Sequence, residues 1–331
     1  MTDLLMPTEK GFYCPPGDFY IDPWQPVPRA VITHVHADHY TPGCGAYTLS
    51  AASEHIARVR LGPQANLRLL PYRTPVTFNG VTVSLHPAGL ILGSAQVRGE
   101  HQGEVWVLSG DYKTDPDPTC APFEPVACDV FITEATFGLP IYHWPPQAAV
   151  FRQINAWWQD NQSQGRASIL YGYALGKAQR LLMGVDPSIG PIYTHGAVES
   201  INDAYRTSGV DLPPTAYALE AEDADWSRAL IVAPPSARGT RWLTRFGPQA
   251  SGYCSGWMTV RGTRRRWSID RGFVISDHVD WALMLGAARA TGAQRVLVTH
   301  GYTAAVARWL REHGLDAAAV DTRYRGEDEA S

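Results

Sequence analysis

Lysine is scarce in this sequence of 331 residues, and the chain carries little excess charge of either sign. Only Lys10, Lys113 and Lys177 are lysines among the 28 basic residues, and the formal net charge is −4 at pH 7. A chain with this charge has no overall attraction to a polyanion, so a local basic patch would have to hold any such partner. The many arginines fit a genomic composition bias as well as they fit phosphate recognition, unless they cluster.

Cysteine is also scarce, and long apolar runs are missing. The five cysteines, an odd number, include no C-x-x-C pair. This pattern favours reduced thiols in a cytoplasmic protein over a disulfide framework. The first residues, MTDLLMPTEKG, show no basic segment followed by an apolar one, so no signal peptide is expected. No apolar run reaches the about 20 residues of a membrane-spanning helix.

The rest of the sequence falls into two regions with different patterns of expected strands and helices. Up to residue 142, short strands with polar residues at their ends dominate, including an Asn-Gly hairpin at 76–87 and a second hairpin at 97–111. From residue 143 to 273, strands alternate with helices, as in ASILYGYALGKAQRLLMGV. We therefore predict one domain formed by residues 1–142 and 274–331, with an α/β domain of residues 143–273 inserted in it.

The strongest chemical signal is the segment THVHADH, residues 33–39, which directly follows an apolar run. Side chains 34, 36 and 38 share one face of an extended chain, and His39 follows on the turn. The segment thus offers His34, His36, Asp38 and His39 at one strand end. Imidazoles and a carboxylate that converge on one point are typical of hydrolytic zinc sites. The alternative is a histidine-rich surface loop.

Other polar residues also follow apolar strands. Asp111 in SGDYK and His300 in VTHG are candidate ligands for a metal pair, and an aspartate can bridge two cations. Glu134 in TEATFG and His278 in SDH suit acid–base chemistry, because an imidazole titrates near neutrality and a carboxylate can orient it. Taken singly, each of these residues can also be structural, as a turn residue, a core histidine or part of a surface ion pair.

In order and spacing, these motifs resemble those of the β-CASP branch of the metallo-β-lactamase superfamily, whose members are nucleases acting on DNA or RNA. The resemblance spans nearly the whole chain, from Asp22 through THVHADH, G-x-x-x-G-S-A, SGDYK, TEATFG and SDH to VTHG. It implies an α/β fold, namely a metallo-β-lactamase αββα sandwich with an inserted α/β β-CASP domain. The phrases YALGKAQRLL, RGTRRRW and DRGFVISDHVDW are more similar to the bacterial ligase-associated DNA exonucleases.

The resemblance also implies roles for the candidate residues. It implies two divalent cations, zinc or manganese, with these ligands: His34, His36 and Asp111 for the first, and Asp38, His39, Asp111 and His300 for the second. Asp22 matches a buried aspartate that orients the histidine loop. Glu134 and His278 match an acid dyad, in which His278 protonates the departing oxygen of a phosphodiester.

One position departs from the family pattern. The loop HPAGLILGSA, residues 86–95, has Leu90 where the family has a histidine that completes the first metal site. Leucine cannot bind a metal, which leaves three explanations: a substitution that weakens or empties the first site, rescue by His86 or a water, or a catalytically silent binding subunit. The strand alternation does not aim His86 at the site, and every other catalytic position is present. We therefore expect a weakened first site.

Candidate contacts to nucleic acid lie in the inserted domain. RGTRRRW contains Arg264, Arg265 and Arg266, whose guanidinium groups suit phosphates. Lys177 lies just inside a predicted helix start, where a phosphate can bind. The structural alternative for the arginine segment is a solvated connector, and the alternative for Lys177 is a plain exposed lysine.

Together, these patterns predict a metal-dependent DNA exonuclease that works in DNA repair, with an ATP-dependent DNA ligase and a helicase as partners. The first alternative is an RNA-processing nuclease of the same fold. The second is a catalytically silent subunit that binds nucleic acid. The third, an ester or thioester hydrolase of the metallo-β-lactamase fold, is disfavoured because it has no use for Glu134, SDH and the inserted module.

Overall fold

The computed structural model describes residues 3–260 and 269–322. Contacts divide the chain into two compact units: residues 3–143 with 278–322, and the described residues from 144 to 277. The predicted phosphate contacts Arg264, Arg265 and Arg266 lie outside the described residues. In the described part, no helix has the length and apolar character needed to cross a membrane.

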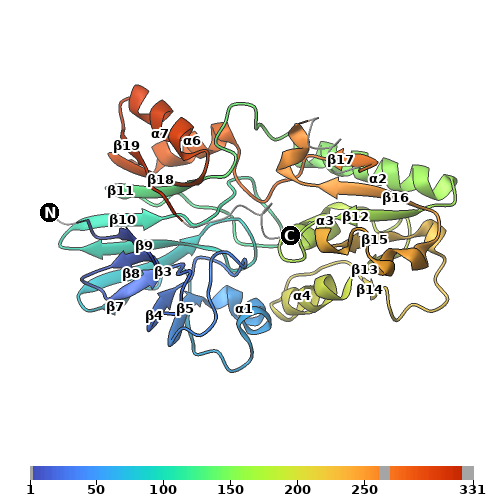
Figure 1. Cartoon of the computed structure of the whole chain (residues 1–331), viewed down its shortest axis with the longest axis horizontal. Coiled ribbons are helices and arrows are strands. Elements are labelled where there is room, and N and C mark those ends of the chain that lie inside the picture. Colours follow the sequence, from blue (N-terminus) through green and yellow to red (C-terminus); the bar gives the residue numbers. More distant parts are fainter. Residues whose placement is uncertain (1–2, 261–268, 323–331) are drawn as a thin grey trace. The chain divides into compact units, whose positions relative to one another are not determined.

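The first unit is built on two β-sheets (Figure 1). The first sheet has the strand order β1-β2-β3-β4-β5-β6. Its strands are β1 (Met6–Thr8), β2 (Gly11–Cys14), β3 (Phe19–Ile21), β4 (Arg29–Val31), β5 (Ala46–Ser50) and β6 (Leu67–Leu70). From β3 to β6 neighbouring strands run parallel, whereas β1, β2 and β3 pair antiparallel.

The second sheet has the order β19-β18-β11-β10-β9-β8-β7. Its strands are β7 (Val76–Phe78), β8 (Val81–Pro87), β9 (Ala95–His101), β10 (Glu104–Leu108), β11 (Val130–Ala135), β18 (Arg295–Gly301) and β19 (Asp316–Ala319). The strands β7 to β10 pair antiparallel, and β10, β11, β18 and β19 pair parallel. The parallel half brings together segments from the beginning and the end of the chain.

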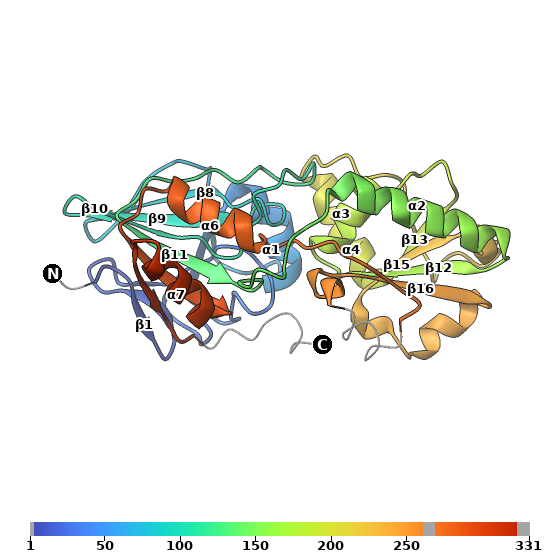
Figure 2. The same cartoon turned by 90° about the horizontal axis from the view of Figure 1, so that it is seen from above.

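Successive side chains along the strands of the second sheet pack into two different apolar cores. Trp106 of β10 lies in a core with Phe12 of the first sheet, whereas the next residue, Val107, lies in a core with residues of α6 (Trp281–Ala290) and α7 (Thr303–Glu312). Successive side chains of a strand point to opposite faces, so one sheet can pack on both sides. Figure 2 shows α6 and α7 on the outer side of this sheet. On the first sheet, β5 is followed by η1 (Ala51–Ser53) and α1 (Glu54–Leu61).

The two predicted hairpins are confirmed as β7–β8 and β9–β10. In the first of them, Asn79 and Gly80 both have positive φ, the backbone conformation that suits a two-residue turn between twisted strands. Strand β8 extends to Pro87, which pairs with Ala95 of β9.

The second unit is a parallel sheet with the order β14-β13-β15-β12-β16-β17. Its strands are β12 (Ala167–Tyr171), β13 (Ile192–Thr194), β14 (Ala216–Tyr217), β15 (Leu230–Ala233), β16 (Gln249–Cys254) and β17 (Arg271–Phe273). Its α-helices are α2 (Gln147–Ser163), α3 (Lys177–Gly184) and α4 (Gly196–Thr207), and its 3-10 helices are η2 (Trp226–Arg228), η3 (Pro235–Ala237), η4 (Arg241–Phe246) and η5 (Gly256–Thr259). Leu170 of β12 packs among residues of α2 and α3, and Ile169 packs on the opposite face. The predicted alternation of strands and helices is confirmed here.

Candidate metal centre and acid dyad

The candidate residues of the first unit gather where strands of both sheets end. Asp22 follows β3, THVHADH follows β4, and Asp111 follows β10. Glu134 and His300 lie in the last residues of β11 and β18, which pair parallel. Parallel strands bring their carboxyl ends to the same edge of a sheet, so residues far apart in the sequence meet there.

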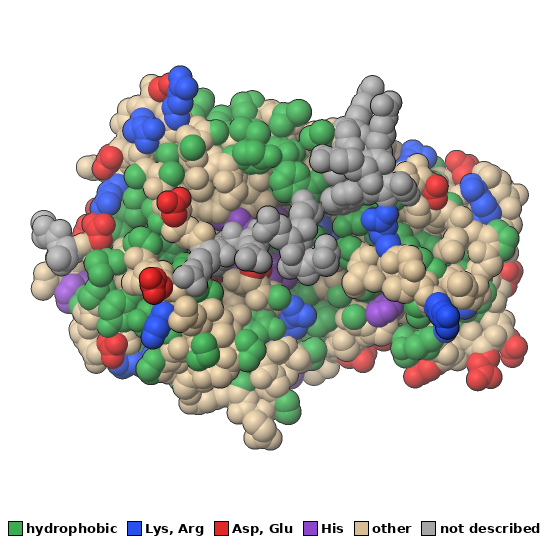
Figure 3. All heavy atoms as spheres, viewed as in Figure 1, with side chains coloured by type: hydrophobic (Ala, Val, Ile, Leu, Met, Phe, Trp, Pro, Cys, Tyr) green, Lys and Arg blue, Asp and Glu red, His purple; other side chains and the backbone are tan. Residues whose placement is uncertain are grey.

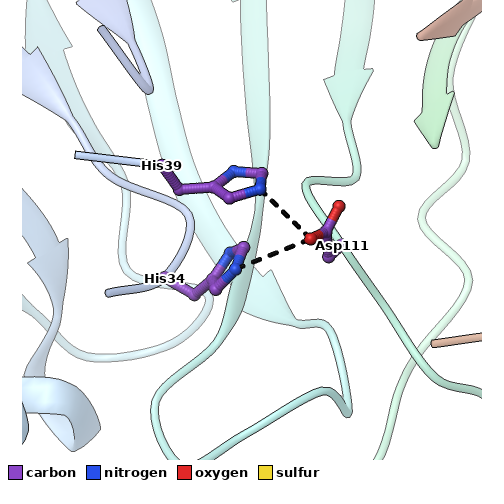
Figure 4. Close-up of side chains that lie close together, drawn as sticks. All are labelled: His34, His39 and Asp111. Atoms are coloured by element: carbon purple, nitrogen blue, oxygen red, sulfur yellow. Dashed lines mark ion pairs between the residues drawn. The ribbon is translucent and has the colours of Figure 1, made fainter. Parts of the chain in front are cut away.

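His34, His39 and Asp111 form the centre of this group, and both rings point toward the carboxylate (Figure 4). His39 Nε2 lies 3.1 Å from Asp111 Oδ2, and His34 Nε2 lies 3.8 Å from the same oxygen. All three residues are buried, and their ligand atoms lie within 4.8 Å of one another. These atom types at this spacing could hold a metal ion.

Asp22 and Thr33 set the orientation of both imidazoles. Asp22 accepts hydrogen bonds from the backbone N–H of Thr33 at 2.8 Å, from the Thr33 hydroxyl, and from His39 Nδ1 at 2.9 Å. Because the single hydroxyl proton of Thr33 goes to Asp22, Thr33 Oγ1 accepts from His34 Nδ1, 3.0 Å away. Each ring therefore carries a proton on Nδ1 and turns its Nε2 toward Asp111.

Two buried atoms of this group fit a bound cation. His34 Nε2 and Asp38 Oδ2 have no hydrogen-bond partner among the described residues. Burial, together with the neighbouring His39 and His36, holds the pKa of His34 well below its usual value. The His34 ring is therefore neutral, the form that binds metals. Buried polar atoms of this kind are costly unless something pairs with them, and a divalent cation would do so.

The carboxylates create a negative environment in the same place. Burial by itself lowers the pKa of His39, but the Asp111 and Asp38 carboxylates raise it well above its usual value. Burial by itself raises the pKa of Asp111, but His39, His278 and His300 hold it well below its usual value. Asp111 is therefore ionised and attracts positive charge.

His300 and His36 extend the cluster. His300 Nδ1 lies 3.5 Å from Asp111 Oδ1. The φ of His300 is 59°, and the β11–β18 register shifts at this point, which makes a bulge that redirects its side chain. The His36 and His34 rings lie 4.8 Å apart. The structure thus brings the residues predicted as ligands into one cluster: His34, His36, Asp38, His39, Asp111 and His300.

Glu134 and His278 form a pair beside this cluster. His278 Nδ1 lies 2.9 Å from Glu134 Oε2 and 4.0 Å from Asp111 Oδ2. Glu134 also accepts hydrogen bonds from the Tyr112 backbone N–H at 2.9 Å and from the Thr136 hydroxyl. These contacts fix the carboxylate, which in turn holds the imidazole by Nδ1. Nε2 is then the ring nitrogen that can exchange a proton with a substrate.

Thr33 and Gly110 belong to the site, and the sequence interpretation assigned neither of them a role. Gly110 has a φ of 59°, and a Cβ there would lie 2.7 Å from Thr33 Cβ and Oγ1. Glycine lets the loop that carries Asp111 approach the strand that carries His34. The signal was present in the sequence, as a threonine directly before His34 and a glycine directly before Asp111.

The loop that contains Leu90 is held by local hydrogen bonds. The backbone N–H groups of Leu90 and Ile91 donate to Ser94 Oγ at 3.1 and 3.2 Å, and Leu90 is buried. The loop ends beside the metal cluster, because the Ala95 backbone N–H donates to the Thr33 carbonyl at 2.8 Å. Leu90 is thus part of a packed turn whose end is tied to the residue before His34.

His86 is engaged by residues outside the metal cluster. Its Nδ1 lies 2.8 Å from Glu124 Oε1, and its Nε2 lies 3.0 Å from Ser84 Oγ. Glu124 is also paired with Arg73. Since both ring nitrogens have these partners, the geometry argues against His86 as a replacement for the missing ligand.

Lys177 corrects an expectation from the sequence. It is the first residue of α3, as predicted, but it is only 2% exposed. Its Nζ lies 2.9 Å from Asp277 Oδ2, and Arg180 Nε lies 3.0 Å from Asp277 Oδ1. An ammonium group buried against a carboxylate is neither the exposed lysine nor the phosphate contact that the helix start indicated. On the face shown in Figure 3, the described basic side chains are interspersed with acidic ones.

The comparisons with known proteins agree with these motifs. A search against models of protein families finds no match. The chain is 31% identical over 312 residues to a probable DNA ligase of Opitutus terrae, over 94% of this chain and 30% of the ligase. It is 29% identical over 146 residues to endoribonuclease ysh1 of Aspergillus fumigatus, over 42% of this chain and 16% of that protein. The chain resembles the metallo-β-lactamase/β-CASP nucleases.

A further β-CASP relative is cleavage and polyadenylation specificity factor subunit 3 of Dictyostelium discoideum, 33% identical over 117 residues, which cover 35% of this chain and 15% of that protein. The chain therefore spans less than a third of the length of each of these relatives. A solved structure of a protein of unknown function from Enterococcus faecalis V583 matches with a TM-score of 0.58, at 10% identity, over 89% of this chain and 80% of that one. At this identity the match concerns the fold alone. The predicted resemblance and the predicted α/β fold class, a metallo-β-lactamase αββα sandwich with an inserted β-CASP domain, are confirmed.

Proposed function

We propose that this protein is a metal-dependent DNA exonuclease that hydrolyses phosphodiester bonds in DNA repair, together with an ATP-dependent DNA ligase. One observation carries the proposal: the buried cluster of His34, His39 and Asp111 lies beside the Glu134–His278 pair. The chain that contains this arrangement aligns over 94% of its length with a protein named as a probable DNA ligase.

Each part of the site has a task in this reaction. The residues that would hold two divalent cations, zinc or manganese, are His34, His36, Asp38, His39, Asp111 and His300. Bound cations supply Lewis-acid stabilisation of the negative charge that develops on the phosphate. Asp22 and Thr33 keep the imidazoles in the orientation and protonation state that ligation needs. His278, oriented by Glu134, delivers a proton to the departing oxygen.

The separate acid pair favours a phosphodiester over a thioester. Cleavage of a nucleic-acid strand expels a sugar alkoxide, a poor leaving group that gains from protonation in the transition state. A positioned imidazole next to a cation site supplies that proton. A thioester hydrolase expels a thiolate and does not need this acid, so the thioester alternative leaves Glu134 and His278 without a task.

The extent of the matches favours DNA over RNA. The relative named as a DNA ligase aligns with 94% of the chain, whereas the endoribonuclease of Aspergillus fumigatus aligns with 42%. The same match supports an ATP-dependent ligase as a partner. A helicase partner stays a prediction from the family resemblance. RNA cleavage is the second candidate, because the shorter matches include proteins named as endoribonucleases.

Leu90 bears on how tightly the site binds its metal ions. We propose that it weakens the first cation site, which keeps His34, His36 and Asp111, and leaves the second intact. A silent binding subunit is the alternative. The geometry argues against it, because the hydrogen bonds that orient His34, His39 and His278 are all in place.

The test is a nuclease assay on the whole chain and on Leu90→His. Both proteins are stripped with a chelator and reloaded with Zn²⁺ or Mn²⁺, and each receives end-labelled single-stranded DNA, double-stranded DNA and RNA. We expect metal-dependent shortening of DNA from an end, with more bound metal and faster cleavage in Leu90→His. Faster cleavage of RNA would replace DNA by RNA as the substrate. Binding of DNA without cleavage in both proteins would support the silent subunit.

A further inference from the structure

We infer that Phe137 is a positioning residue of the acid step, because its ring fixes the plane of the His278 imidazole while Glu134 holds Nδ1. The inference rests on the proposed function, since it concerns the proton that His278 is proposed to deliver. All the residues that it uses belong to the first unit. Phe137 acts through His278 and not on the substrate itself.

The contact with Glu134 leaves one movement of the His278 ring open. His278 Nδ1 lies 3.1 Å from Glu134 Oε1 and 2.9 Å from Oε2, so the carboxylate holds a single ring atom. The torsion that turns an imidazole about its bond to Cβ has broad minima, so a ring held at one atom can still tilt. Tilting changes the direction of the Nε2–H bond, and the rate of an oriented reaction falls steeply with such displacements.

The ring of Phe137 supplies the second contact. Its centroid lies 5.9 Å from that of the His278 ring, and the two planes meet at 65°. This is the edge-to-face arrangement that aromatic rings prefer. Both side chains are buried, so tilting of the imidazole would have to displace the phenyl ring. One contact at Nδ1 and one on the ring together define the plane of the imidazole.

A further pair of rings holds Phe137. The Tyr142 ring centroid lies 5.0 Å from that of Phe137, and the planes meet at 70°. The Tyr142 hydroxyl lies 3.3 Å from the Tyr302 hydroxyl, and the ring centroids of these two tyrosines lie 5.9 Å apart. Close-packed side chains in a protein core stay near their rotamer minima. Phe137, between His278 and Tyr142 in this series of ring contacts, is therefore held in place.

The backbone turn that carries Phe137 is fastened as well. The Ala135 carbonyl accepts hydrogen bonds from the Gly138 N–H at 3.0 Å and from the Tyr302 N–H at 2.8 Å. The first bond closes the turn around Phe137, and the second ties this turn to the end of β18. A Cβ on Gly301 would lie 2.3 Å from the Ala135 carbonyl oxygen, so glycine permits this approach.

The kinetic experiment compares two substrates that differ in their leaving group. DNA expels a sugar oxygen that needs a proton, whereas the p-nitrophenyl ester of thymidine 5′-monophosphate expels p-nitrophenolate, which leaves without one. For Phe137→Leu we expect kcat on DNA to fall about 10-fold or more, with KM and the kcat on the ester changed less than about threefold. Phe137→Tyr keeps the ring and should retain most of the rate on DNA.

Two more variants separate positioning from folding. Phe78→Leu is the matched control, because it removes a buried ring that lies 5.2 Å from the Phe19 ring in another apolar core of the same unit. It should leave the ratio of the two rates unchanged. Phe137→Met fills more of the space of the ring with a flexible side chain and is used if Phe137→Leu does not fold. It should also lose rate on DNA selectively, since it supplies no ring.

Proton NMR of the metal-free chain gives a readout that needs neither substrate nor activity. A proton held between His278 Nδ1 and the Glu134 carboxylate is protected from exchange with water and resonates at low field, and its loss in His278→Gln assigns it. We expect this signal in wild type and Phe137→Tyr. In Phe137→Leu it should broaden or disappear, while the dispersed methyl signals of the folded chain remain.

The outcomes separate this inference from the proposed function. If His278→Ala loses rate on DNA selectively while Phe137→Leu and Phe137→Met change both rates equally, or neither, the inference is wrong and the acid role of His278 stands. An unchanged low-field proton in Phe137→Leu would also overturn it. If wild type cleaves neither substrate with either metal, the proposed function fails and the inference falls with it. Selective loss on DNA without the ring, retention in Phe137→Tyr and the loss of the low-field proton support the inference.

Discussion

Each unit buries a cluster of ionisable side chains, but the two clusters differ in the side chains that surround the central carboxylate. In the second unit, the Asp277 carboxylate lies 2.9 Å from the Lys177 ammonium group and 3.0 Å from the Arg180 guanidinium group. In the first unit, the Asp111 carboxylate lies among imidazoles, 3.1 Å from His39 Nε2 and 3.8 Å from His34 Nε2.

This difference distinguishes a cluster that maintains structure from one that binds a ligand. A buried carboxylate that is paired with lysine and arginine side chains is already compensated, and the cluster is damaged when its carboxylate or a cation is removed. A cluster of carboxylates and imidazoles gains stability when a cation binds to it, because the cation binds only the folded chain. Variants should therefore affect stability in the second unit, and metal affinity and catalysis in the first.

The largest effect is expected in the cluster of Asp277, Lys177 and Arg180. Lys177→Met leaves Asp277 with less compensation in a buried environment and should lower the free energy of unfolding by about 3–5 kcal/mol. Urea unfolding of the whole chain measures this, with Lys10→Met, which replaces an exposed lysine, as the matched control. A loss below about 1 kcal/mol, typical of an exposed ion pair, would show that the cluster is not the buried structural pair described here.

Removal of the central carboxylate of the metal cluster should strongly reduce catalysis. Asp111→Asn should lower kcat/KM on DNA by at least about 100-fold, or about 2.8 kcal/mol in transition-state stabilisation, because the cations lose the carboxylate between His34 and His39. Asp316→Asn, at an exposed position of β19, is the control. Activity within about threefold of wild type in Asp111→Asn is incompatible with this account.

The hydroxyl of Thr33 should have a smaller effect on the same cluster. Thr33→Val keeps the shape of the side chain but removes the donor to Asp22 and the acceptor for His34 Nδ1. We expect metal affinity to fall about 10-fold, and Thr33→Ser to retain wild-type affinity. Titration with the metal measures both, and Thr77→Val, on the edge strand β7, serves as the control. Equal metal affinities in the valine and serine variants would show that the Thr33 hydroxyl does not contribute to metal binding.

The smallest effect concerns acid stability in the second unit. Burial by itself raises the pKa of Glu199, but hydrogen bonds from Thr194, Arg206 and Thr215 hold it below its ordinary value. A lowered pKa in the folded chain stabilises that chain above the unfolded pKa of about 4.3, and this contribution is lost as the pH falls through the folded pKa. Glu199→Gln should be about 1 kcal/mol less stable than wild type near neutral pH.

The pH dependence is the check on this assignment. In urea unfolding, the difference between wild type and Glu199→Gln should shrink from about pH 5 downward and vanish once the carboxyl group is protonated in both states. A difference that is the same at all pH values would mean that the contribution does not come from the charge of Glu199.

Much of the metal cluster could be predicted from the sequence because its residues carry a local signal. THVHADH, SGDYK and VTHG each place a polar residue directly after an apolar run, and parallel strands bring such positions to one edge. The orienting hydrogen bonds were harder to predict. Thr33 gave no periodic signal, and its role depends on Asp22, which reaches it only through the packing of β3 beside β4.

The cluster of Asp277, Lys177 and Arg180 could not be predicted in the same way. Lys177 lies at a helix start whether it is exposed or buried, and its partner Asp277 is distant in the sequence. Only the packing of the second unit decides whether Lys177 is exposed or buried. His86 is an intermediate case: strand alternation indicated that it points away from the metal cluster, and the structure adds its partners Ser84 and Glu124.

The central claim is that the first unit binds divalent cations through Asp111, and metal binding tests it without relying on activity. The chelator-treated chain is titrated with Zn²⁺ or Mn²⁺ while bound metal and Tm are measured, beside Asp111→Asn and Lys177→Met. Wild type should bind at least about one equivalent and gain about 5 °C or more in Tm; Lys177→Met should still bind, and Asp111→Asn should show neither response. A wild-type chain that binds no metal, or an Asp111→Asn variant that binds as wild type does, would contradict the claim.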